Sequence, residues 1–441
     1  MADITLSYKG STVATIDESC SKKLDTQGKY CEDDIYIDYV KPGGSLVEVP
    51  RSDVNFMDYD GKVLYSYTAA DALALEALPE NPSHAGLTAQ GWNYTLAEMK
   101  TIVGYRGKCD IGQMYVTSDG STRLYCHFEN DRRWPYLGLA VDGTVSIDWG
   151  DNTELNTLSG TSMSGSVKYI RHDYPSGGDY VIKITKVSGN GFSILDDESG
   201  NRSSILCFGS GNSGYSDYVY LNALLKVELG NNVLIGPGAF STCASLRSIS
   251  IPIGAMSDCA YAFGECLSLV AIILPSGVTS CQDDIFYYCR ALTSISIPVS
   301  CIEIGSYAFS YCTALHSIVL SNNIGQIGEY AFYLGGFSSI DLPNNITEIS
   351  QSMFEGQYAL ASLVIPSSVT NIERNAFRDC SCLSKIRILS ISPPSLENTN
   401  AFFGTNCTIY VPYSSDHSIL DAYLEATNWA TLAANIMEEP Q

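Results

Sequence analysis

The chain has 441 residues, with 25 Lys and Arg against 48 Asp and Glu, which gives a formal net charge of −23. Nucleic acid is excluded as a partner because a phosphate backbone needs clustered basic residues, and adsorption to an anionic membrane is disfavoured for the same reason. No apolar run of about 18 residues or more is present, so we expect no membrane insertion, and the start MADITLSY lacks the basic and apolar pattern of a signal peptide.

Residues 1–44 alternate as short strands. The segments ITLSY, STVATI and IYIDYV have the two-residue period of half-exposed strands, and the breaker-rich KPGGS follows them. The stretch ESCSKKLDTQGKYCEDDI resembles a module at the start of phage and prophage tail-associated proteins, which implies a small β attachment module over residues 1–44. For Cys20 and Cys31 we favour packing roles and keep a disulfide as the alternative.

Residues 45–130 mix strand and helix signals. Asp60-Gly61 predicts a hairpin turn, and Thr68 followed by Asp71 predicts the start of a helix over AADALALEAL. The stretch from VNFMDYDG to GLTAQGWN resembles the β-grasp-like internalin B-repeat. DYDG lacks the later ligands of a calcium loop. Two aromatic residues are expected in the core or on the sheet face rather than as ligand stackers: Trp92 and Tyr94.

Residues 131–205 contain VSIDWGDNTE and YIRHDYPSGGDYVIKI, which resemble the PKD-like β-sandwich and its W-G-D-G turn. Asn152 stands where the second Gly is usual, and both residue types tolerate the left-handed conformation. The resemblance implies a spacer module. For four polar residues we favour turn and capping hydrogen bonds over a metal site: Asp148, Asp151, His172 and Asp173.

Residues 206–412 are a repeat, in which Phe recurs every 22, 23 or 25 residues: Phe240, Phe263, Phe286, Phe309, Phe332, Phe354, Phe377 and Phe402. One unit reads AFxxCxxLxxIxIPxxVxxIGxx, where IxI predicts a strand ended by Pro, and VxxIGxxAF predicts a helical or 3₁₀ turn. This pattern resembles the BspA-like leucine-rich repeat family. The resemblance implies a curved solenoid with internal ladders of Phe, Leu, Ile and Cys.

Cysteine follows the same period. Cys243, Cys266, Cys289 and Cys312 are each 23 residues apart, which marks a repeat position rather than a disulfide framework or a zinc site. We therefore expect buried, reduced, structural thiols.

Residues 413–441 resemble the closing segment of the same family, with a strand ending in YVP and then a helix. A solenoid needs such a cap for its exposed end. The residues expected to cover the core are Leu420, Tyr423, Leu424 and Trp429. The predicted fold class is therefore mainly β and multidomain: small β modules, then a 23-residue leucine-rich-repeat solenoid with a C-terminal helical cap.

The strand face of the solenoid is the candidate binding face. It is rich in small residues and poor in charge, which suits docking of a protein or a face hidden by assembly. A solvated face without a ligand is the alternative. The candidate residues are Arg247, Ser248, Ser250, Val270, Ile273, Ser294, Ser296, His316, Val319, Asp341, Val364, Lys385 and Arg387.

Catalytic, cofactor and metal motifs are not found. A GxGxxG string at residues 209–214 has no surrounding βαβ unit, and we interpret it as a domain junction. Walker A, HExxH, GxSxG and CxxC patterns are missing from the sequence. We expect no enzyme activity, no cofactor and no metal.

Two functions fit this organisation, and a third has no supporting residues. The first is a phage or prophage virion protein made in the host cytoplasm, of the tail-fibre kind, with its amino terminus attached to other virion proteins and its solenoid acting as receptor-binding part for a host-surface protein or glycan. The alternative is a BspA-like adhesin of the bacterial cell surface. An enzyme such as a glycan hydrolase has no supporting residues. A homo-oligomer is compatible with either of the first two.

Overall fold

The computed structural model describes residues 4–8, 11–16, 51–130, 133–164, 166–195, 206–207, 223–256 and 258–440. The chain divides into two compact units, residues 1–49 and 50–441. In the first unit, β1 (Ile4–Tyr8) pairs antiparallel with β2 (Ser11–Ile16). The strand predicted at IYIDYV, the pair Cys20 and Cys31, and the linker KPGGS lie outside the described residues.

The second unit begins with a small module of four strands and two helices. Its sheet has the order β4-β3-β6-β5, in which β3 and β6 are parallel and the other pairs are antiparallel. Its elements are β3 (Val54–Met57), β4 (Val63–Tyr67), α1 (Ala69–Ala74), β5 (Leu87–Trp92), α2 (Leu96–Arg106) and β6 (Cys109–Thr117).

Local signals in this module are confirmed. Gly61 has φ +86° in the turn between β3 and β4, and Thr68 caps α1 by accepting from the Asp71 amide. Trp92 and Tyr94 are buried in the core, as predicted, beside Phe56. The indole of Trp92 meets the Phe56 ring edge-on at 5.0 Å between centroids.

The middle sheet follows: β7 (Thr122–Phe128), β8 (Tyr136–Asp148), β9 (Asn156–Thr161), β10 (Lys168–Arg171), β11 (Gly178–Ile194) and β12 (Leu206–Cys207). β7 lies before the predicted boundary at residue 130, but it pairs with β11 and so is part of the middle sheet. The turn after β8 forms as predicted: Asn152 has φ +64°, and the Asp148 carboxylate accepts from the Gly150 amide.

The middle sheet continues into the solenoid without a break. The first solenoid strand, β13 (Leu224–Glu228), pairs antiparallel with β7, and β14 (Val233–Ile235) pairs parallel with the end of β11. One hydrophobic core accordingly runs from Leu124 to Ile436. The middle sheet thus covers the first turn of the stack and protects the edge that it would otherwise expose.

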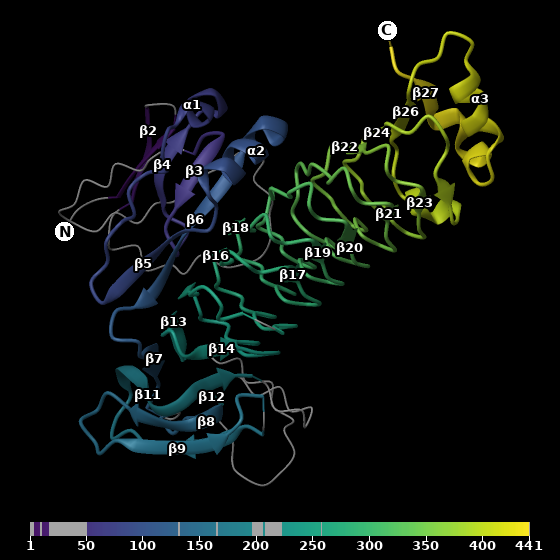
Figure 1. Cartoon of the computed structure of the whole chain (residues 1–441). Helices are drawn as coiled ribbons and strands as arrows, with labels where there is room; N and C mark the ends of the chain where they lie inside the picture. The colour runs from purple at the N-terminus through teal and green to yellow at the C-terminus, as the bar shows by residue number, and fades with distance from the viewer. Residues whose placement is uncertain are drawn as a thin grey trace. The chain divides into compact units, whose positions relative to one another are not determined.

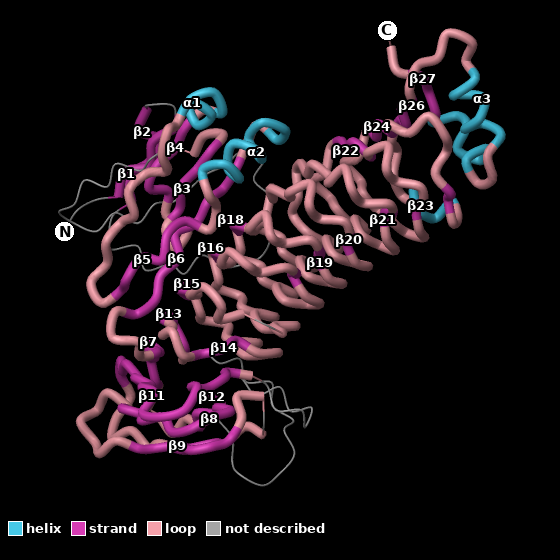
Figure 2. The backbone as a smooth tube through the Cα atoms, in the orientation of Figure 1, coloured by secondary structure: helices cyan, strands magenta, loops and turns pink. Residues whose placement is uncertain are grey.

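The solenoid has about nine turns with a repeat of about 23 residues. Its strands are short, and most of its chain is loop, whereas helices gather in the small module and at the carboxyl end (Figure 2). Two rows of parallel strands run along opposite edges (Figure 1). The first row contains β13, β15 (Ser248–Ser250), β16 (Ala271–Ile273), β18 (Ser294–Ser296), β22 (Ser362–Ile365), β24 (Lys385–Ile388), β26 (Thr408–Val411) and β27 (Ile436–Glu438).

The second row contains β14, β17 (Ser280–Cys281), β19 (Glu303–Ile304), β20 (Gln326–Ile327), β21 (Glu348–Ile349), β23 (Asn371–Ile372) and β25 (Ser395–Leu396). It occupies the IG part of each repeat. The predicted helical or 3₁₀ turn is wrong at its start, where the residue before each Ile joins a two-residue parallel ladder with its neighbours. Stacking decides this, because a strand can pair with the adjacent turn. Turns with hydrogen bonds between residues three apart follow over the AF part, as from Ser310 to Tyr307.

The predicted ladders are internal. Successive Phe rings from Phe240 to Phe402 stack with centroids 5.4 to 6.0 Å apart. The Cys266 thiol donates to the Phe240 carbonyl of the turn before, at 3.2 Å, and the later cysteines of the period repeat this contact. Where the period lacks Cys, the Gln357 amide donates to the Phe332 carbonyl instead. The cysteine period therefore has a structural cause.

The carboxyl end closes the stack with η1 (Thr399–Phe402), α3 (Ser418–Glu425) and η2 (Trp429–Asn435). Tyr423 and Trp429 are fully buried, and Leu420 and Leu424 pack against the same core, as predicted. The Trp429 ring follows Phe402 at 6.0 Å, and its indole N–H donates to the Pro394 carbonyl at 2.7 Å. The ladder thus ends on an aromatic residue whose polar atom is satisfied.

Candidate binding face

The register of the first strand row defines which side chains point outward. Ile249, Ile272 and their equivalents point into the core, so the residues before and after them face out. Ser248, Ser250, Ile273, Ser294, Ser296, Val319, Asp341, Val364, Lys385 and Arg387 lie in these positions, as predicted. Arg247, Val270 and His316 lie one residue earlier, where the chain enters the strand; they are exposed but outside the two outward columns. The sequence analysis missed Ala271, Tyr410 and Met437.

The small module covers the first half of this face. Asn93 donates to the Leu274 carbonyl at 3.0 Å and to the Ser296 hydroxyl at 2.9 Å. The Ser296 hydroxyl donates to the Asp110 carbonyl of β6 at 2.6 Å. Similarly, Tyr94 donates to the carbonyl of Ile297. Side chains of the module thereby satisfy carbonyls at the ends of the short solenoid strands, which would otherwise be buried without partners.

The contact extends to the middle of the solenoid. Arg106, at the end of α2, donates to the Leu320 carbonyl at 3.0 Å and to the Leu342 carbonyl at 3.1 Å. Lys108 pairs with Asp341 at 3.1 Å. Four carbonyls in register along the stack therefore receive a side chain of the module: those of Leu274, Ile297, Leu320 and Leu342.

Backbones also approach closely. A Cβ placed on Gly112 of β6 would lie 2.3 Å from the Ile273 side chain, and one on Gly61 would lie 2.4 Å from the Ala271 Cβ. Met57, Met114 and Ile273 form a small apolar cluster at this point. Glycine and small side chains are required here because the two surfaces leave no room for larger ones.

The covered half of the face is therefore not open to a partner. Ser250, Ile273, Ser294 and Ser296 are at most 3% exposed. The expectation that they line an open binding surface is wrong, because the chain itself occupies that surface. The abundance of small residues was the sequence signal for a hidden face, but sequence spacing could not name residues 50–117 as the cover.

We expect Gly112→Val to wedge the module away from the solenoid, since the new side chain collides with Ile273. Overpacking of this kind costs about 1–3 kcal/mol. Hydrogen exchange should become at least about fivefold faster at residues 294–297, because 1 kcal/mol corresponds to about fivefold. Gly104→Ala in α2 is the matched control, since a Cβ there has no neighbour within 4 Å. Unchanged exchange in Gly112→Val would contradict the docking contact.

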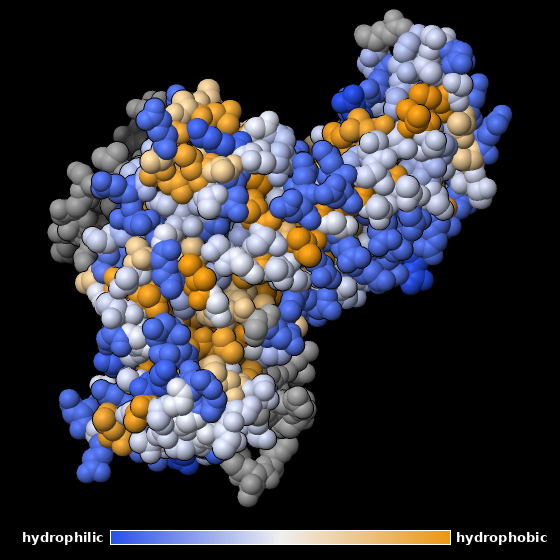
Figure 3. Space-filling model, viewed as in Figure 1, coloured by the Kyte–Doolittle hydropathy of each residue, from blue (hydrophilic) through white to orange (hydrophobic). Residues whose placement is uncertain are grey.

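The second half of the face is uncovered. We define the open strip as Ser362, Val364, Lys385, Arg387, Tyr410 and Met437. Val364 is 46% exposed and Met437 is 52% exposed. The Lys385 ammonium lies 4.7 Å from the Tyr410 ring centre, and the Arg387 guanidinium pairs with Glu439 through a 2.8 Å hydrogen bond. In the view of Figure 3 the hydrophobic residues form separate patches among hydrophilic ones. The open strip therefore offers apolar contact flanked by cations.

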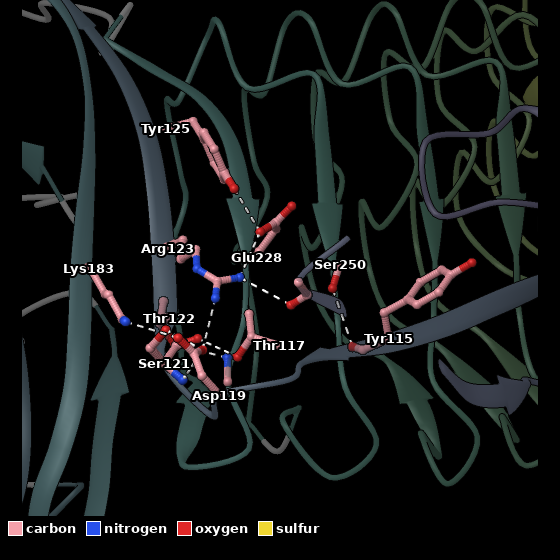
Figure 4. A network of polar contacts seen from close by, with 12 residues as sticks. Tyr115, Thr117, Asp119, Ser121, Thr122, Arg123, Tyr125, Lys183, Glu228 and Ser250 are labelled. Carbon is pink, nitrogen blue, oxygen red and sulfur yellow. Dashed lines mark hydrogen bonds and ion pairs between the residues drawn. The ribbon is translucent and has the colours of Figure 1, made fainter. Parts of the chain in front are cut away.

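A polar network joins the small module, the middle sheet and the solenoid (Figure 4). The Glu228 carboxylate of β13 accepts from Tyr125 at 2.8 Å and from Arg123 at 3.3 Å, both on β7. Arg123 also pairs with Asp119 at 2.9 Å, and Asp119 with Lys183 of β11 at 2.9 Å. In addition, the Ser250 hydroxyl donates to the Tyr115 carbonyl of β6 at 3.3 Å.

The charges of this network depend on their partners. Burial opposes ionisation of Glu228, but hydrogen bonds from Lys226, Tyr125 and Arg123 outweigh it and lower the pKa of this carboxyl. Burial likewise opposes ionisation of Asp119, yet hydrogen bonds from Ser121 and Lys183 and the charge of Arg123 hold its pKa well below the usual range. Both carboxylates are therefore ionised at neutral pH.

Comparison with known families decides the type of repeat. Residues 233–358 and 303–424 match the family described as BspA type leucine rich repeat region, in six copies. The solenoid is built of BspA-type repeats. The modules before it, which resemble PKD-like, internalin and phage tail modules, have no such match.

Solved structures give more distant likenesses. A leucine-rich repeat protein from Bacteroides ovatus ATCC 8483 is 21% identical over 49% of this chain, with a TM-score of 0.31, and the match spans 66% of that protein, just under two thirds. A leucine rich cell surface protein from Faecalibacterium prausnitzii A2-165 is 19% identical over 53% of this chain and 93% of its own, with a TM-score of 0.22. A comparison with curated proteins gives no match.

The cysteines of the BspA-type solenoid are placed as structural thiols. The twelve cysteines whose side chains the structure describes are free thiols, and Cys382 alone among them is exposed. Burial raises the pKa of Cys266 and Cys312, and that of Cys289 to about 12. Thiolates are therefore disfavoured in the ladder.

The polar residues that suggested a metal site make turn contacts instead. His172 bonds Asp151 at 2.7 Å and stacks on Trp149 at 4.6 Å, and Asp173 pairs with Arg171 at 2.8 Å. Within the described ranges no group of three or more His, Cys, Asp or Glu is arranged to hold a metal. No helix in that part of the chain has the length and apolar character of a membrane span. The GxGxxG string lies outside the described residues.

Proposed function

We propose that this protein is a non-enzymatic binding protein of the bacterial surface, whose BspA-type solenoid holds a partner protein on the open strip. The observation that carries the proposal is the strand face itself. Its first half already binds a folded module through side chains that reach strand-end carbonyls. The open strip continues the same face, with Val364 and Met437 exposed. Exposed apolar residues beside cations are suited to a protein partner.

The surface location follows from the resemblance to BspA-like proteins, for which adhesion at the bacterial surface is expected. The virion hypothesis has no support from the comparisons. It rests on the amino-terminal module, on the missing signal-peptide pattern and on the chain of β modules that ends in the solenoid. Residues 18–35 of that amino-terminal module lie outside the described residues. We therefore prefer the adhesin.

The location is tested with antibodies against residues 223–441 applied to producing bacteria. Staining of intact cells is expected, and staining that requires permeabilisation would contradict surface display. This test does not depend on which face binds.

Binding is tested with point variants, because a deletion of the solenoid would also expose the edge of β7. We expect Val364→Glu together with Met437→Glu to lower adhesion of producing cells to wells coated with host-surface proteins by about tenfold or more, since burial of a Val or Met side chain contributes about 1.5–3 kcal/mol, which the variant loses. Val187→Glu is the matched control: Val187 is an exposed valine of β11, far along the chain from the open strip. Undiminished adhesion of the double variant would show that another surface binds.

A further inference from the structure

A row of tyrosines follows the second strand row, on the turn before β17 and on the turns after β17, β19 and β20. We define the tyrosine belt as Tyr261, Tyr287, Tyr288, Tyr307, Tyr311, Tyr330 and Tyr333. Their rings lie in a chain of contacts: Tyr307 and Tyr330 stack at 4.6 Å with only 2° between planes, Tyr288 and Tyr311 lie 4.8 Å apart, and Tyr311 and Tyr333 lie 5.5 Å apart. Each ring is partly exposed. An aromatic surface thus continues over several turns.

Five belt residues stand in a strained backbone conformation. Tyr261, Tyr288, Tyr307, Tyr311 and Tyr330 have φ between +56° and +63°. Two positions in each repeat adopt this left-handed conformation, and where they lack tyrosine they hold Gly238, Gly356 and Asn375 but also Thr242, Glu265, Leu334 and Ser352. The left-handed conformation is therefore a property of the repeat, and in the belt it carries tyrosine rings that contact one another on the surface.

The surroundings of the belt are acidic. An open hollow of about 640 Å³ lies beside the belt. Its lining includes the carboxylates of Glu265 and Asp284 and the rings of Tyr261, Tyr287 and Tyr307. The charge of Glu329 contributes to raising the pKa of Tyr307, and the charge of Glu355 does the same for Tyr333. From residue 251 to residue 380 the positive charges are three arginines: Arg290, Arg374 and Arg378. The belt therefore presents electron-rich rings beside carboxylates, a combination that attracts cations.

One cation already uses the belt. The Arg290 guanidinium lies 4.1 Å from the Tyr288 ring centre and donates to the Tyr288 hydroxyl. Burial is the main cause that raises the pKa of Tyr287 and Tyr307, and neighbouring tyrosines and carboxylates add to it. Their rings therefore stay neutral phenols. A neutral ring with a negative face suits a planar guanidinium, which can stack and donate at once.

We propose that the tyrosine belt binds an extended, arginine-rich segment of a partner protein. The charge of the surface favours such a segment over a neutral glycan. The chain has a net charge of −23, and the belt has carboxylates beside its stacking rings. Alternate side chains of an extended segment face the same way, about 6.6–6.8 Å apart, so several of them reach successive rings. This site goes beyond the open strip, which lies on the other strand row and has cations of its own.

The probe is a peptide of about twelve residues in which Arg and Gly alternate, so that it carries about six positive charges. A peptide of the same length with Gln in place of Arg is its neutral counterpart. Binding to the full chain is measured by titration calorimetry at low and high salt. The test variant combines Tyr288→Asn, Tyr307→Asn, Tyr311→Asn and Tyr330→Asn, since Asn accepts the left-handed conformation, as at Asn375. Tyr413→Asn, at an exposed tyrosine of the carboxyl-terminal segment, is the matched control.

We expect the Arg-Gly peptide to bind at least about tenfold more tightly than the Gln-Gly peptide, with weakening at high salt. The quadruple variant should bind at least about tenfold more weakly than the wild type, while its melting temperature stays equal or rises. Glu329→Gln should weaken binding to a smaller extent. Three results would overturn the proposal: equal binding by the quadruple variant, binding of a neutral glucan oligosaccharide in place of the peptide, or a fall of melting temperature that shows the rings to be structural.

Discussion

Phe309→Ala is expected to lower the free energy of unfolding by about 3–5 kcal/mol, the range for truncation of a buried Phe. The ring is fully buried and stacks with Phe286 at 5.5 Å and Phe332 at 6.0 Å. A cavity here interrupts the ladder in the middle of the solenoid, where neither cap can relax to fill it. Urea unfolding followed by circular dichroism measures the change.

Phe403→Ala is the control, because Phe403 follows the ladder residue Phe402 but is 58% exposed. Its effect should stay below about 1 kcal/mol, as for surface substitutions away from special features. If both variants unfold at the same urea concentration, the Phe ladder does not stabilise the stack. Because the repeats contact mainly their neighbours, the variant can also unfold in more than one step.

Glu228→Ala is expected to cost about 3 kcal/mol, the lower end of the range for breaking a buried ion pair. The carboxylate is 4% exposed and holds Arg123, Tyr125 and Lys226 together. Its loss leaves Lys226 without its carboxylate and leaves Arg123 with Asp119 alone. Glu348→Ala is the control, because Glu348 begins β21 with an exposed side chain. Thermal and urea unfolding of both variants test the difference.

The same residue predicts a pH dependence. The pKa of Glu228 is lowered in the folded chain relative to the usual value of about 4.3, so its contribution is present above that value and is lost as the pH falls through the folded pKa. The wild type should therefore lose stability between about pH 5 and pH 3 more steeply than Glu228→Ala. Parallel curves for the two proteins would show that Glu228 is not ionised at the junction.

The repeat region was largely predictable because its signals are local and recur. Each Phe, Cys and Ile occupies the same place in every turn, so a period in the sequence becomes a ladder in space. The cap was predictable for a similar reason: an apolar helix and Trp429 must cover the last turn. The short second row was not predicted, since two residues such as Glu303 and Ile304 form a strand only because the next turn pairs with them.

The tyrosine belt was within reach of the sequence but was missed. Tyr288 and Tyr311, like Tyr307 and Tyr330, are 23 residues apart, which the repeat search could have found among the 29 tyrosines. Their left-handed backbone, which separates them from ordinary surface tyrosines, is visible only in the structure.

The sequence by itself determined the repeat, its inward residues and its capped end, because stacking identical turns leaves the periodic apolar side chains one place to go. Only the tertiary structure decided which part of the strand face is free. Residues 93 to 115 meet carbonyls and hydroxyls at residues 250 to 342, contacts that span up to 236 positions and carry no period. Complementarity of shape, seen where Gly112 faces Ile273, selects that pairing, and no pattern along one chain encodes it.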